Sequence, residues 1–232
     1  MERGAQFERI ISPEGKELGN VTEEFFDKIL TSPEVIGSGQ TAEILVNNDY
    51  PDGENFCVKK ITNLDSPFFP RKSIDHELGV QRQIHQIPGV RVPEPIAGAV
   101  VRYDDGSRGQ FALMERIFGH SVADILDQRL DLPPGFDVEK FVADLRGMVD
   151  KMHKRDYYHR DLHEGNVMVE WDTFSPVIID FGLSKKAVTQ EEREHPYIDF
   201  GFSRPGHVPV ATNDLTNITR RIQNPLRRYA LS

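Results

Sequence analysis

The sequence predicts an α+β fold in two parts: an antiparallel sheet with one helix, then a reduced, mostly helical part. Two apolar stretches at 97–103 and 110–115 flank the turn Asp104-Asp105-Gly106-Ser107-Arg108-Gly109, which indicates a β-hairpin. Between 137 and 156, apolar residues recur at the spacing of one helix face. These residues are Phe141, Leu145, Met148 and Met152.

The other elements of the first part have local signals of their own. The apolar run Phe56-Cys57-Val58-Lys59 indicates a strand, and residues 73–84 indicate a helix. Ser73 is a suitable N-cap for this helix, and Asp75 and Glu77 lie near its positive N-terminal end. Residues 1–34 are expected to precede the first strand and to hold a short helix at 22–30, capped by Thr22.

Shorter elements are predicted in the second part. A short helix is expected at 121–128, and the apolar runs 167–169 and 177–179 are expected to pair across the turn at 171–175. Near the end of the chain, 214–223 predicts one closing helix with Asp214 as its cap.

Composition indicates a cytoplasmic protein large enough to bury a core. The chain has 232 residues, a formal net charge of -9 and a single cysteine, Cys57, so no intrachain disulfide can form. The acidic balance argues against nucleic acid as a partner. No apolar stretch reaches the ~18 residues that a membrane span needs.

The residues with the clearest chemistry lie between 158 and 182. Asp161 is followed five positions later by the amide of Asn166, and Asp180-Phe181-Gly182 follows an apolar run. A general base and two oxygen ligands for a metal are what phosphoryl transfer from a nucleotide requires. Taken singly, the triplet could be a turn after a strand, and a second one stands at Asp199-Phe200-Gly201. The order and spacing of the two motifs favour a metal site at Asp180 and a turn at Asp199.

The pattern H-R-D-L-x-x-x-N followed by D-F-G resembles the protein-kinase superfamily. The resemblance implies a bilobal protein-kinase-like fold that uses ATP and Mg²⁺. It implies an N-terminal extension at 1–34, an N-lobe at 35–116 and a C-lobe at 117–232. In this scheme Asp161 accepts or orients the hydroxyl proton of the acceptor, and Asn166 and Asp180 bind magnesium.

The N-terminal half resembles the nucleotide-binding part of the same superfamily. A glycine hairpin would cover the phosphates, and it comprises Gly37, Ser38, Gly39, Gln40, Thr41 and Ala42. Lys59 would hold the α- and β-phosphates, oriented by Glu77. Lys60 is the alternative, but neighbouring strand residues face opposite ways, so only one lysine can serve. The plainer alternatives are a simple hairpin turn and a Glu77 that only complements the helix dipole.

Three further positions follow from the resemblance. Residues 114–119 resemble the hinge that binds adenine, with Met114 as gatekeeper and the backbone of Glu115 and Ile117 on the base. His163 stands where protein kinases usually carry a lysine near the γ-phosphate, and this resembles aminoglycoside-type phosphotransferases. Packing of the loop is the other reading of His163. Gln81 replaces an apolar residue that the superfamily usually has one turn after the glutamate.

The sequence leaves three functions open. A Ser/Thr protein kinase is favoured by Arg160 and by the 47 residues from Met114 to Asp161, too few for the inserted helices of small-molecule kinases. A small-molecule phosphotransferase, aminoglycoside- or sugar-kinase-like, is favoured by His163 and the short tail. The third is a pseudokinase scaffold, in which all these residues would be kept without use.

The end of the chain departs from the family pattern. No A-P-E anchor follows Asp180, so the C-lobe is expected to be reduced. This resembles certain bacterial effector kinases delivered into a host cytosol, and it implies activity without phosphorylation of the segment after Asp180. A basic cluster close to the C-terminus could bind an acidic protein partner, or it could be a solvated helix face. The cluster consists of Arg220, Arg221, Arg227 and Arg228.

Overall fold

The structure of the protein is a computed structural model that describes residues 6–11, 26, 28, 30–39, 42–49, 53–61, 74–197 and 213–231. The chain divides into two compact units. The first comprises residues up to 82 together with 93–116, and the second comprises 83–92 and 117 onward. The first unit holds an antiparallel sheet with helical segments, and the second is mainly helical, which confirms the predicted α+β fold class.

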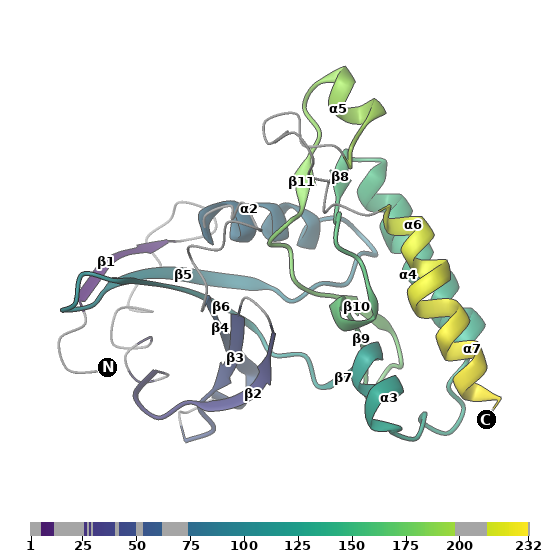
Figure 1. Ribbon diagram of the computed structural model, residues 1–232, viewed down its shortest axis with the longest axis horizontal. Helices are drawn as coiled ribbons and strands as arrows, with labels where there is room; N and C mark the ends of the chain where they lie inside the picture. The colour runs from purple at the N-terminus through teal and green to yellow at the C-terminus, as the bar shows by residue number, and fades with distance from the viewer. Residues whose placement is uncertain are drawn as a thin grey trace. The chain divides into compact units, whose positions relative to one another are not determined.

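The first unit is built on one six-stranded antiparallel sheet, drawn in purple to teal in Figure 1. Its strand order is β1-β5-β6-β4-β3-β2. The strands are β1 (Gln6–Ile11), β5 (Pro95–Arg102), β6 (Arg108–Glu115), β4 (Phe56–Ile61), β3 (Ala42–Val46) and β2 (Glu34–Ser38). A 3-10 turn, η1 (Gly53–Asn55), leads into β4, and the helix α2 (Ile74–His85) comes before β5.

Strand β1 corrects the expectation that the first strand follows residue 34. It pairs antiparallel with β5, and Phe7 and Ile10 pack against the core of the sheet. The carboxylate of Glu8 binds Arg102 Nε at 2.5 Å and Arg108 Nε at 3.0 Å. The strand is six residues long and bulged after Phe7, so its alternation of apolar and polar residues is too short to stand out in the sequence. Of the helix expected at 22–30, Phe26, Lys28 and Leu30 are described and helical, whereas Thr22 lies outside the described residues.

The sheet has a buried cluster on each face because side chains alternate along a strand. One cluster includes Val58, Phe111 and Leu113, and it takes up Phe26. The other includes Cys57, Ala112 and Met114, and α2 packs on it through Ile74 and Leu78. The expected N-cap of α2, Ser73, lies outside the described residues. These two clusters fix β4 and β6, the strands that carry Lys59 and Met114.

The second unit is organised around the helix α4 (Val138–His153). Asp137 caps it by accepting hydrogen bonds from the amides of Glu139 and Lys140, and the predicted apolar stripe Phe141, Leu145, Met148 and Met152 is buried. The remaining elements of this unit are small. They are α3 (Val122–Gln128), β7 (Gly119–Ser121), β8 (Tyr157–Tyr158), the 3-10 turn η2 (Glu164–Asn166), β9 (Val167–Glu170), β10 (Pro176–Ile178), β11 (Lys185–Lys186) and α5 (Gln190–Glu194).

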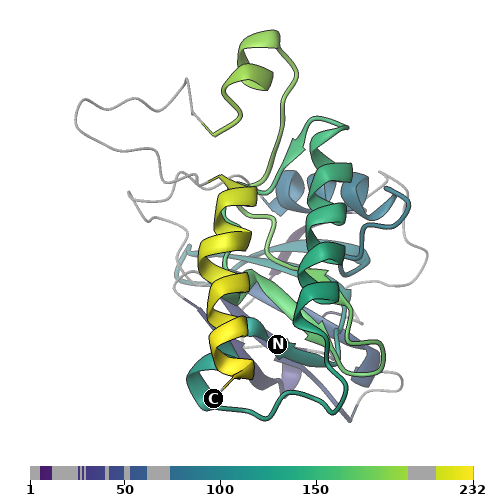
Figure 2. The same cartoon turned by 90° about the vertical axis from the view of Figure 1, so that its right-hand side faces the viewer.

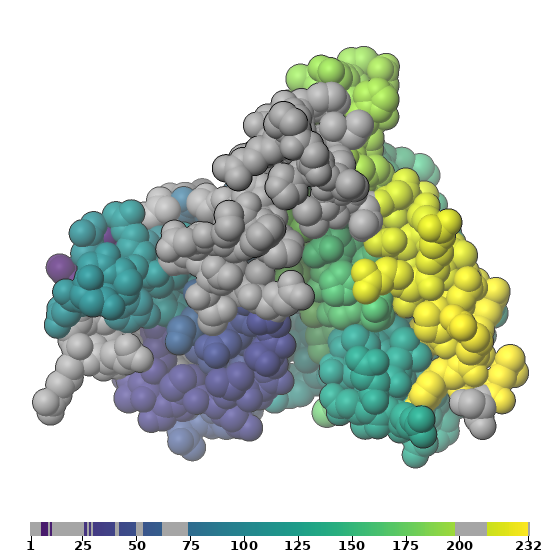
Figure 3. Space-filling view, in the orientation of Figure 1, coloured from purple at the N-terminus to yellow at the C-terminus, as the bar shows by residue number. Residues whose placement is uncertain are grey.

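A continuous helical run ends the described chain. It consists of α6 (Asp214–Asn217), the π-helical segment η3 (Ile218–Gln223) and α7 (Asn224–Ala230), and it lies beside α4 (Figures 1 and 2). Arg146 of α4 donates a 2.5 Å hydrogen bond to Thr219 Oγ1. On the face shown in Figure 3, this run and α3 lie at the surface of the second unit.

Two details of the closing helix differ from the prediction. The cap is Asn213, whose side chain accepts from the amide of Thr216, and Asp214 is instead fully buried. The helix also continues past Gln223 to Ala230, although Pro225 follows directly. Proline is tolerated in a first turn, and the wide π turn before it lets the helical run continue without a proline N–H.

Candidate active site

The loop that carries Asp161 is held by a buried carboxylate from the closing helix. Asp214 Oδ2 accepts a hydrogen bond from the amide of His159 at 3.0 Å, and Oδ1 accepts one from the amide of Arg160 at 2.8 Å. His153 Nε2 lies 3.0 Å from the same Oδ2. Arg160 has a φ of 70°, a left-handed conformation that is unfavourable for a residue with a side chain. The two amide bonds therefore fix a strained backbone immediately before Asp161.

Sequence reasoning missed this role of Asp214. The pattern Asn213-Asp214 offers two residues that can cap a helix, and the prediction chose the second. Because the Asn213 side chain is sufficient to cap the helix, an adjacent aspartate that is not needed as a cap was the one sequence signal that Asp214 has another role. Asp161 and Asp214 are 53 positions apart, and nothing in the sequence between them indicates that Asp214 holds the catalytic loop.

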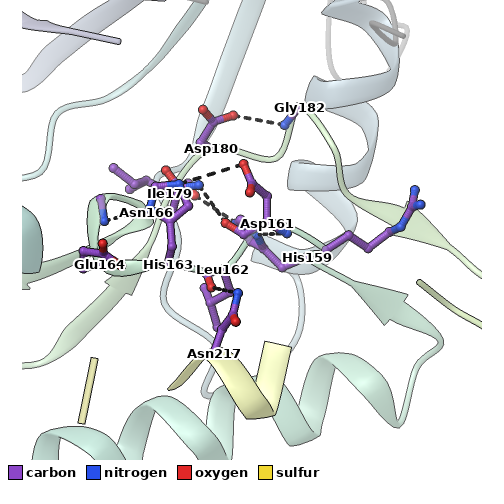
Figure 4. A network of polar contacts seen from close by, with 12 residues as sticks. His159, Asp161, Leu162, His163, Glu164, Asn166, Ile179, Asp180, Gly182 and Asn217 are labelled. Carbon is purple, nitrogen blue, oxygen red and sulfur yellow. Dashed lines mark hydrogen bonds and ion pairs between the residues drawn. The ribbon is translucent and has the colours of Figure 1, made fainter. Parts of the chain in front are cut away.

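Asn166 braces the same loop from its other end. Its side chain is buried, and Nδ2 donates a 2.9 Å hydrogen bond to the carbonyl of Asp161 (Figure 4). With Nδ2 used in this way, the atom that Asn166 can offer to a cation is Oδ1. The carbonyl of Asn166 accepts from the amide of Ile179 at 3.0 Å, which ties the loop to the residue before Asp180.

Asp180 follows β10 at a turn with a φ of 61°. Its Oδ1 accepts a 3.1 Å hydrogen bond from the amide of Gly182, which orients the carboxylate (Figure 4). Asp180 is near enough to Asp161 for their charges to interact. The structure thus brings Asp161, Asn166 and Asp180 together in the second unit.

The carboxyl of Asp161 has a raised pKa. Burial is the largest cause, and the negative charge of Asp180 acts in the same direction. Electrostatic interactions with His163, His159 and Arg221 oppose these effects and lower the pKa. Asp161 therefore holds a proton more tightly than an exposed aspartate.

His163 contributes to the loop in two ways. Its Nδ1 accepts a 3.0 Å hydrogen bond from the amide of Gly165, so the ring caps the turn η2. An acceptor Nδ1 carries no proton, which places the hydrogen of the neutral ring on Nε2. That atom lies 3.9 Å from Asp161 Oδ2. The ring packs the loop and also directs an N–H toward Asp161.

The closing helix contacts the loop at two further points. Asn217 Nδ2 donates to the carbonyl of Leu162 at 2.8 Å (Figure 4). Arg221 forms an ion pair with Glu164 at 2.8 Å. Arg227, in turn, binds the carboxylate of Glu139 through two nitrogens. Arg221 and Arg227 are thus paired with carboxylates of the chain, and Arg228 Nε donates to the carbonyl of Asn224 at 3.2 Å. All four arginines of the basic cluster are exposed.

In the first unit, Lys59 and Glu77 form a buried ion pair. Lys59 Nζ lies 2.6 Å from Glu77 Oε1, and each side chain is 7% exposed. Lys60 points the other way, where its Nζ lies 3.7 Å from Glu43 at the surface. Strand β4 therefore directs only Lys59 toward α2.

The glycine hairpin is formed by β2 and β3. Gly37 pairs with Ile44 and Ser38 with Glu43, and the amide of Gly39 donates to the carbonyl of Ala42 at 2.8 Å. A Cβ at Gly39 would meet nothing nearer than 3.8 Å, so space rather than crowding surrounds this glycine. The other two hairpin residues of the prediction, Gln40 and Thr41, lie outside the described residues.

The expected hinge residues end the first unit. Met114 is buried beside Cys57, and the amide of Glu115 already donates to Glu94 O at 2.9 Å. Burial raises the pKa of the Cys57 thiol to about 12, so it stays protonated and approaches Glu115 O at 3.7 Å. Glu115 could thus offer its carbonyl, not its amide, to a base. Ile117 is half-buried and opens the second unit.

Gln81 is accommodated within the first unit. It is 2% exposed, and its Nε2 donates a 2.8 Å hydrogen bond to the carbonyl of Pro93. Its polar group is therefore paired inside the protein, as a buried amide must be. This departure from the superfamily pattern has a local structural explanation.

The described residues contain neither a cluster of metal-ligating side chains nor a membrane-spanning helix. No group of three or more His, Cys, Asp or Glu side chains there could hold a metal ion. No helix in the same part of the chain has the length and apolar character needed to cross a membrane.

The chain matches a known protein family over most of its length. The family model described as "Protein kinase domain" matches residues 30–217, which is well over half of the sequence. The chain belongs to the protein kinase family. This confirms the resemblance predicted from the catalytic-loop and Asp-Phe-Gly motifs, and the matched region includes the predicted site residues from Gly37 to Asp180.

The chain is less than 30% identical to each of three individual relatives. The chain is 28% identical to "Mitogen-activated protein kinase kinase 2" of Arabidopsis thaliana over 65% of its own length and 39% of that protein. It is 26% identical to "CBL-interacting serine/threonine-protein kinase 16" of the same plant, over 65% of its own length and 30% of that protein. A shorter match is to the "Probable bifunctional tRNA threonylcarbamoyladenosine biosynthesis protein" of Methanosphaera stadtmanae. The two are 29% identical over 40% of this chain and 18% of that protein. The chain spans less than two fifths of each of these relatives.

Proposed function

We propose that this kinase domain transfers the γ-phosphate of ATP to a serine or threonine hydroxyl of a protein. The observation that carries the proposal is the braced loop of the second unit, which holds Asp161 and Asn166 and has Asp180 close to Asp161. Asp161 would accept or orient the proton of the acceptor hydroxyl. Its raised pKa increases its affinity for that proton.

The donor side of the reaction rests on the first unit. Lys59 would hold the α- and β-phosphates, and its ion pair with Glu77 fixes the ammonium in place. The hairpin of Gly37, Ser38, Gly39, Gln40, Thr41 and Ala42 would cover the phosphates, because glycine lets backbone amides approach them closely. Met114, the carbonyl of Glu115 and the amide of Ile117 would bind adenine.

The residues present fit a magnesium ion. Magnesium prefers oxygen ligands and is usually held by one or two protein groups together with substrate phosphates. Asn166 Oδ1 and a carboxylate oxygen of Asp180 are such a pair. Bound there, the ion would supply charge neutralisation on the transferring phosphate. His163 Nε2–H would add a hydrogen-bond donor beside Asp161.

The direct test is transfer from labelled ATP with magnesium. The full chain is incubated with a generic protein substrate, with a cell lysate and with a panel of aminoglycosides and sugars, and Asp161→Ala serves as the control. Label on serine or threonine that depends on Asp161 is the expected result. Label on a small molecule alone would replace the proposal by the second candidate.

The second candidate is a small-molecule phosphotransferase of the aminoglycoside- or sugar-kinase type. The N–H of His163 directed toward Asp161 favours it, because such a group could contact a small acceptor or its phosphate. A third outcome, no transfer and no ATP hydrolysis above the Asp161→Ala level, would indicate a pseudokinase scaffold.

Three further features of the protein belong to the proposal. We take residues 35–116 as the N-lobe and 117–232 as the C-lobe, with β1 adding a strand from the N-terminal extension. An acidic protein partner would use Arg220 and Arg228, and its binding should weaken as salt increases. Similarity to effector kinases suggests action in a cytosol, including that of a host cell.

A further inference from the structure

In the segment after Asp180, Tyr197 contacts residues that lie next to the catalytic loop. Its hydroxyl accepts a 3.3 Å hydrogen bond from the amide of Asp214 and lies 3.5 Å from His153 Nε2. Its ring meets the ring of Tyr158 edge-on, at 5.8 Å and 78°. Tyr158 in turn lies against the imidazole of His153, with ring centroids 4.7 Å apart.

The hydrogen bond to Asp214 satisfies a specific need. Asp214 is the first residue of α6, and the amides of a first helical turn have no partner within the helix. The Asn213 side chain satisfies the amide of Thr216, and the Tyr197 hydroxyl satisfies that of Asp214. Because Asp214 is fully buried, its amide would otherwise be costly to leave unpaired.

The start of the same segment is also attached near the catalytic loop. Strand β11 pairs with β8, and the amide of Ala187 donates to the carbonyl of Asp156 at 2.8 Å. Arg193 of α5 forms an ion pair with Asp156 at 3.1 Å. The residues from Lys185 to Tyr197 are therefore anchored at one end on β8 and Asp156, just before the catalytic loop, and at the other end on Asp214 and the ring of Tyr158.

No phosphate is needed for any of these contacts. Thr189 caps α5 through its hydroxyl, and Ser184 is fully buried with its hydroxyl donating to the carbonyl of His159. Lys185 forms an ion pair with Glu192, and this pairing, with the amides of Val188 and Thr189, lowers the pKa of Glu192 to about 2. The segment is thus closed by its own side chains.

We propose that Tyr197 is a positioning residue that ties this segment to the catalytic loop through Asp214. The tether fixes the carboxylate that holds the amides of His159 and Arg160, and so the strained backbone before Asp161. It takes the place of an A-P-E anchor and of a phosphorylated loop residue. That the tether replaces a phosphorylated residue in supporting activity rests on the proposed phosphotransferase function. That Tyr197 positions the catalytic loop does not.

The test compares Tyr197→Phe with Tyr229→Phe. Both variants remove one hydroxyl from the second unit, and the Tyr229 hydroxyl bonds to the carbonyl of Leu130, away from the catalytic loop. We expect Tyr197→Phe to lower kcat about fivefold with little change in the KM for ATP, as the loss of one hydrogen bond allows. Amide hydrogen exchange at His159 and Arg160 should become faster in Tyr197→Phe and stay unchanged in Tyr229→Phe.

Two outcomes would overturn the tether. One is exchange at His159 and Arg160 in Tyr197→Phe that matches the unmodified protein. The other is equal losses of kcat and of melting temperature in both variants, which would mean general destabilisation. Hydrogen exchange needs no enzymatic activity, so absence of phosphotransfer would reject the proposed function while leaving the tether to be judged by exchange alone.

Discussion

The carboxyl of Asp161 is surrounded by groups that change its proton affinity in opposite directions. Burial and the charge of Asp180 raise its pKa, whereas His163, His159 and Arg221 lower it. The oxygen that Asn166 holds is the main-chain carbonyl, so the carboxylate itself is not occupied by this brace. At the scale of single residues, the loop fixes the backbone of Asp161 and leaves its side chain to interact with an acceptor.

Replacing Asp161 by alanine should remove phosphoryl transfer and leave nucleotide binding largely intact. A general base contributes about 10²–10⁴ in rate, so kcat should fall by about that factor. Nucleotide affinity, measured by calorimetry, should change little because Lys59 and Glu77 belong to the other unit. A variant that keeps most of its transfer rate would refute this role for Asp161.

The raised pKa of Asp161 predicts where activity is lost in acid. A base must be unprotonated, so activity appears as the pH rises through its pKa and disappears as the pH falls through it. The acid limb of kcat/KM should therefore lie above the value of about 3.9 typical of an exposed aspartate. Because the charge of Arg221 lowers the Asp161 pKa, Arg221→Gln should move this limb to higher pH. A limb that moves to lower pH would contradict the assignment.

Two neighbouring lysines provide a matched pair of variants. Lys59 is buried and paired with Glu77, whereas Lys60 is partly exposed beside Glu43. Lys59→Met should cut kcat/KM for ATP by at least about tenfold, since charge-assisted contacts contribute about 1.5–3 kcal/mol. Lys60→Met should stay within about twofold, as exposed ion pairs contribute little. The opposite ranking in a transfer assay would show that the phosphate lysine is Lys60.

At the scale of elements, the closing helical run acts as the support of the catalytic loop. Its residues Asp214, Asn217 and Arg221 follow one another at helical spacing and each contacts the loop. The π-helical segment lies directly after Asn217 and includes Arg221. Wide turns of this kind are frequent at functional sites, and here the segment carries the last of the three contacts.

Asp214→Ala should destabilise the protein more than loss of the helix cap. The change removes the acceptor of two buried amides, and each unpaired group costs about 1–3 kcal/mol. Asn213→Ala removes the cap and should cost only about 1 kcal/mol. Denaturant unfolding of both variants measures the difference. Equal losses would mean that the carboxylate does little for the loop.

At the scale of the whole molecule, two compact units divide the chemistry between them. The first contains the glycine hairpin and the Lys59–Glu77 pair, and the second contains Asp161, Asn166 and Asp180. The first is rigidified by a six-stranded sheet with a buried cluster on each face, and the second by α4 and the closing helical run. Each set of site residues is thus positioned by its own core.

The two Asp-Phe-Gly triplets give a prediction that involves the whole second half of the chain. Asp180 lies after β10 and beside Asp161, whereas Asp199 lies outside the described residues. Loss of a metal ligand removes charge stabilisation of several kcal/mol. Asp180→Asn should therefore abolish magnesium-dependent transfer, and Asp199→Asn should keep most of it. The reverse pattern would move the metal site to the second triplet.

Much of this protein could be predicted from its sequence, because local signals are strong where an element is long or a motif is dense. The stripe of α4, the hairpin of β5 and β6 and the buried face of α2 follow from periodicity and turn residues. The family follows from two motifs whose residue types and spacing are hard to obtain by chance. These features depend on residues close together in the chain.

What only the tertiary structure decided depends on residues that are far apart in the chain. Strand β1 forms because it pairs with the edge strand β5 and because Arg102 forms an ion pair with Glu8. A segment of six residues is too short for its own sequence pattern to indicate this strand. Asp214 was predicted as a cap, but the fold buries it against the amides of His159 and Arg160. Tyr197 joins the same group from a third segment. Such contacts have no sequence period, since a buried polar group is satisfied by whichever segment folding brings to it.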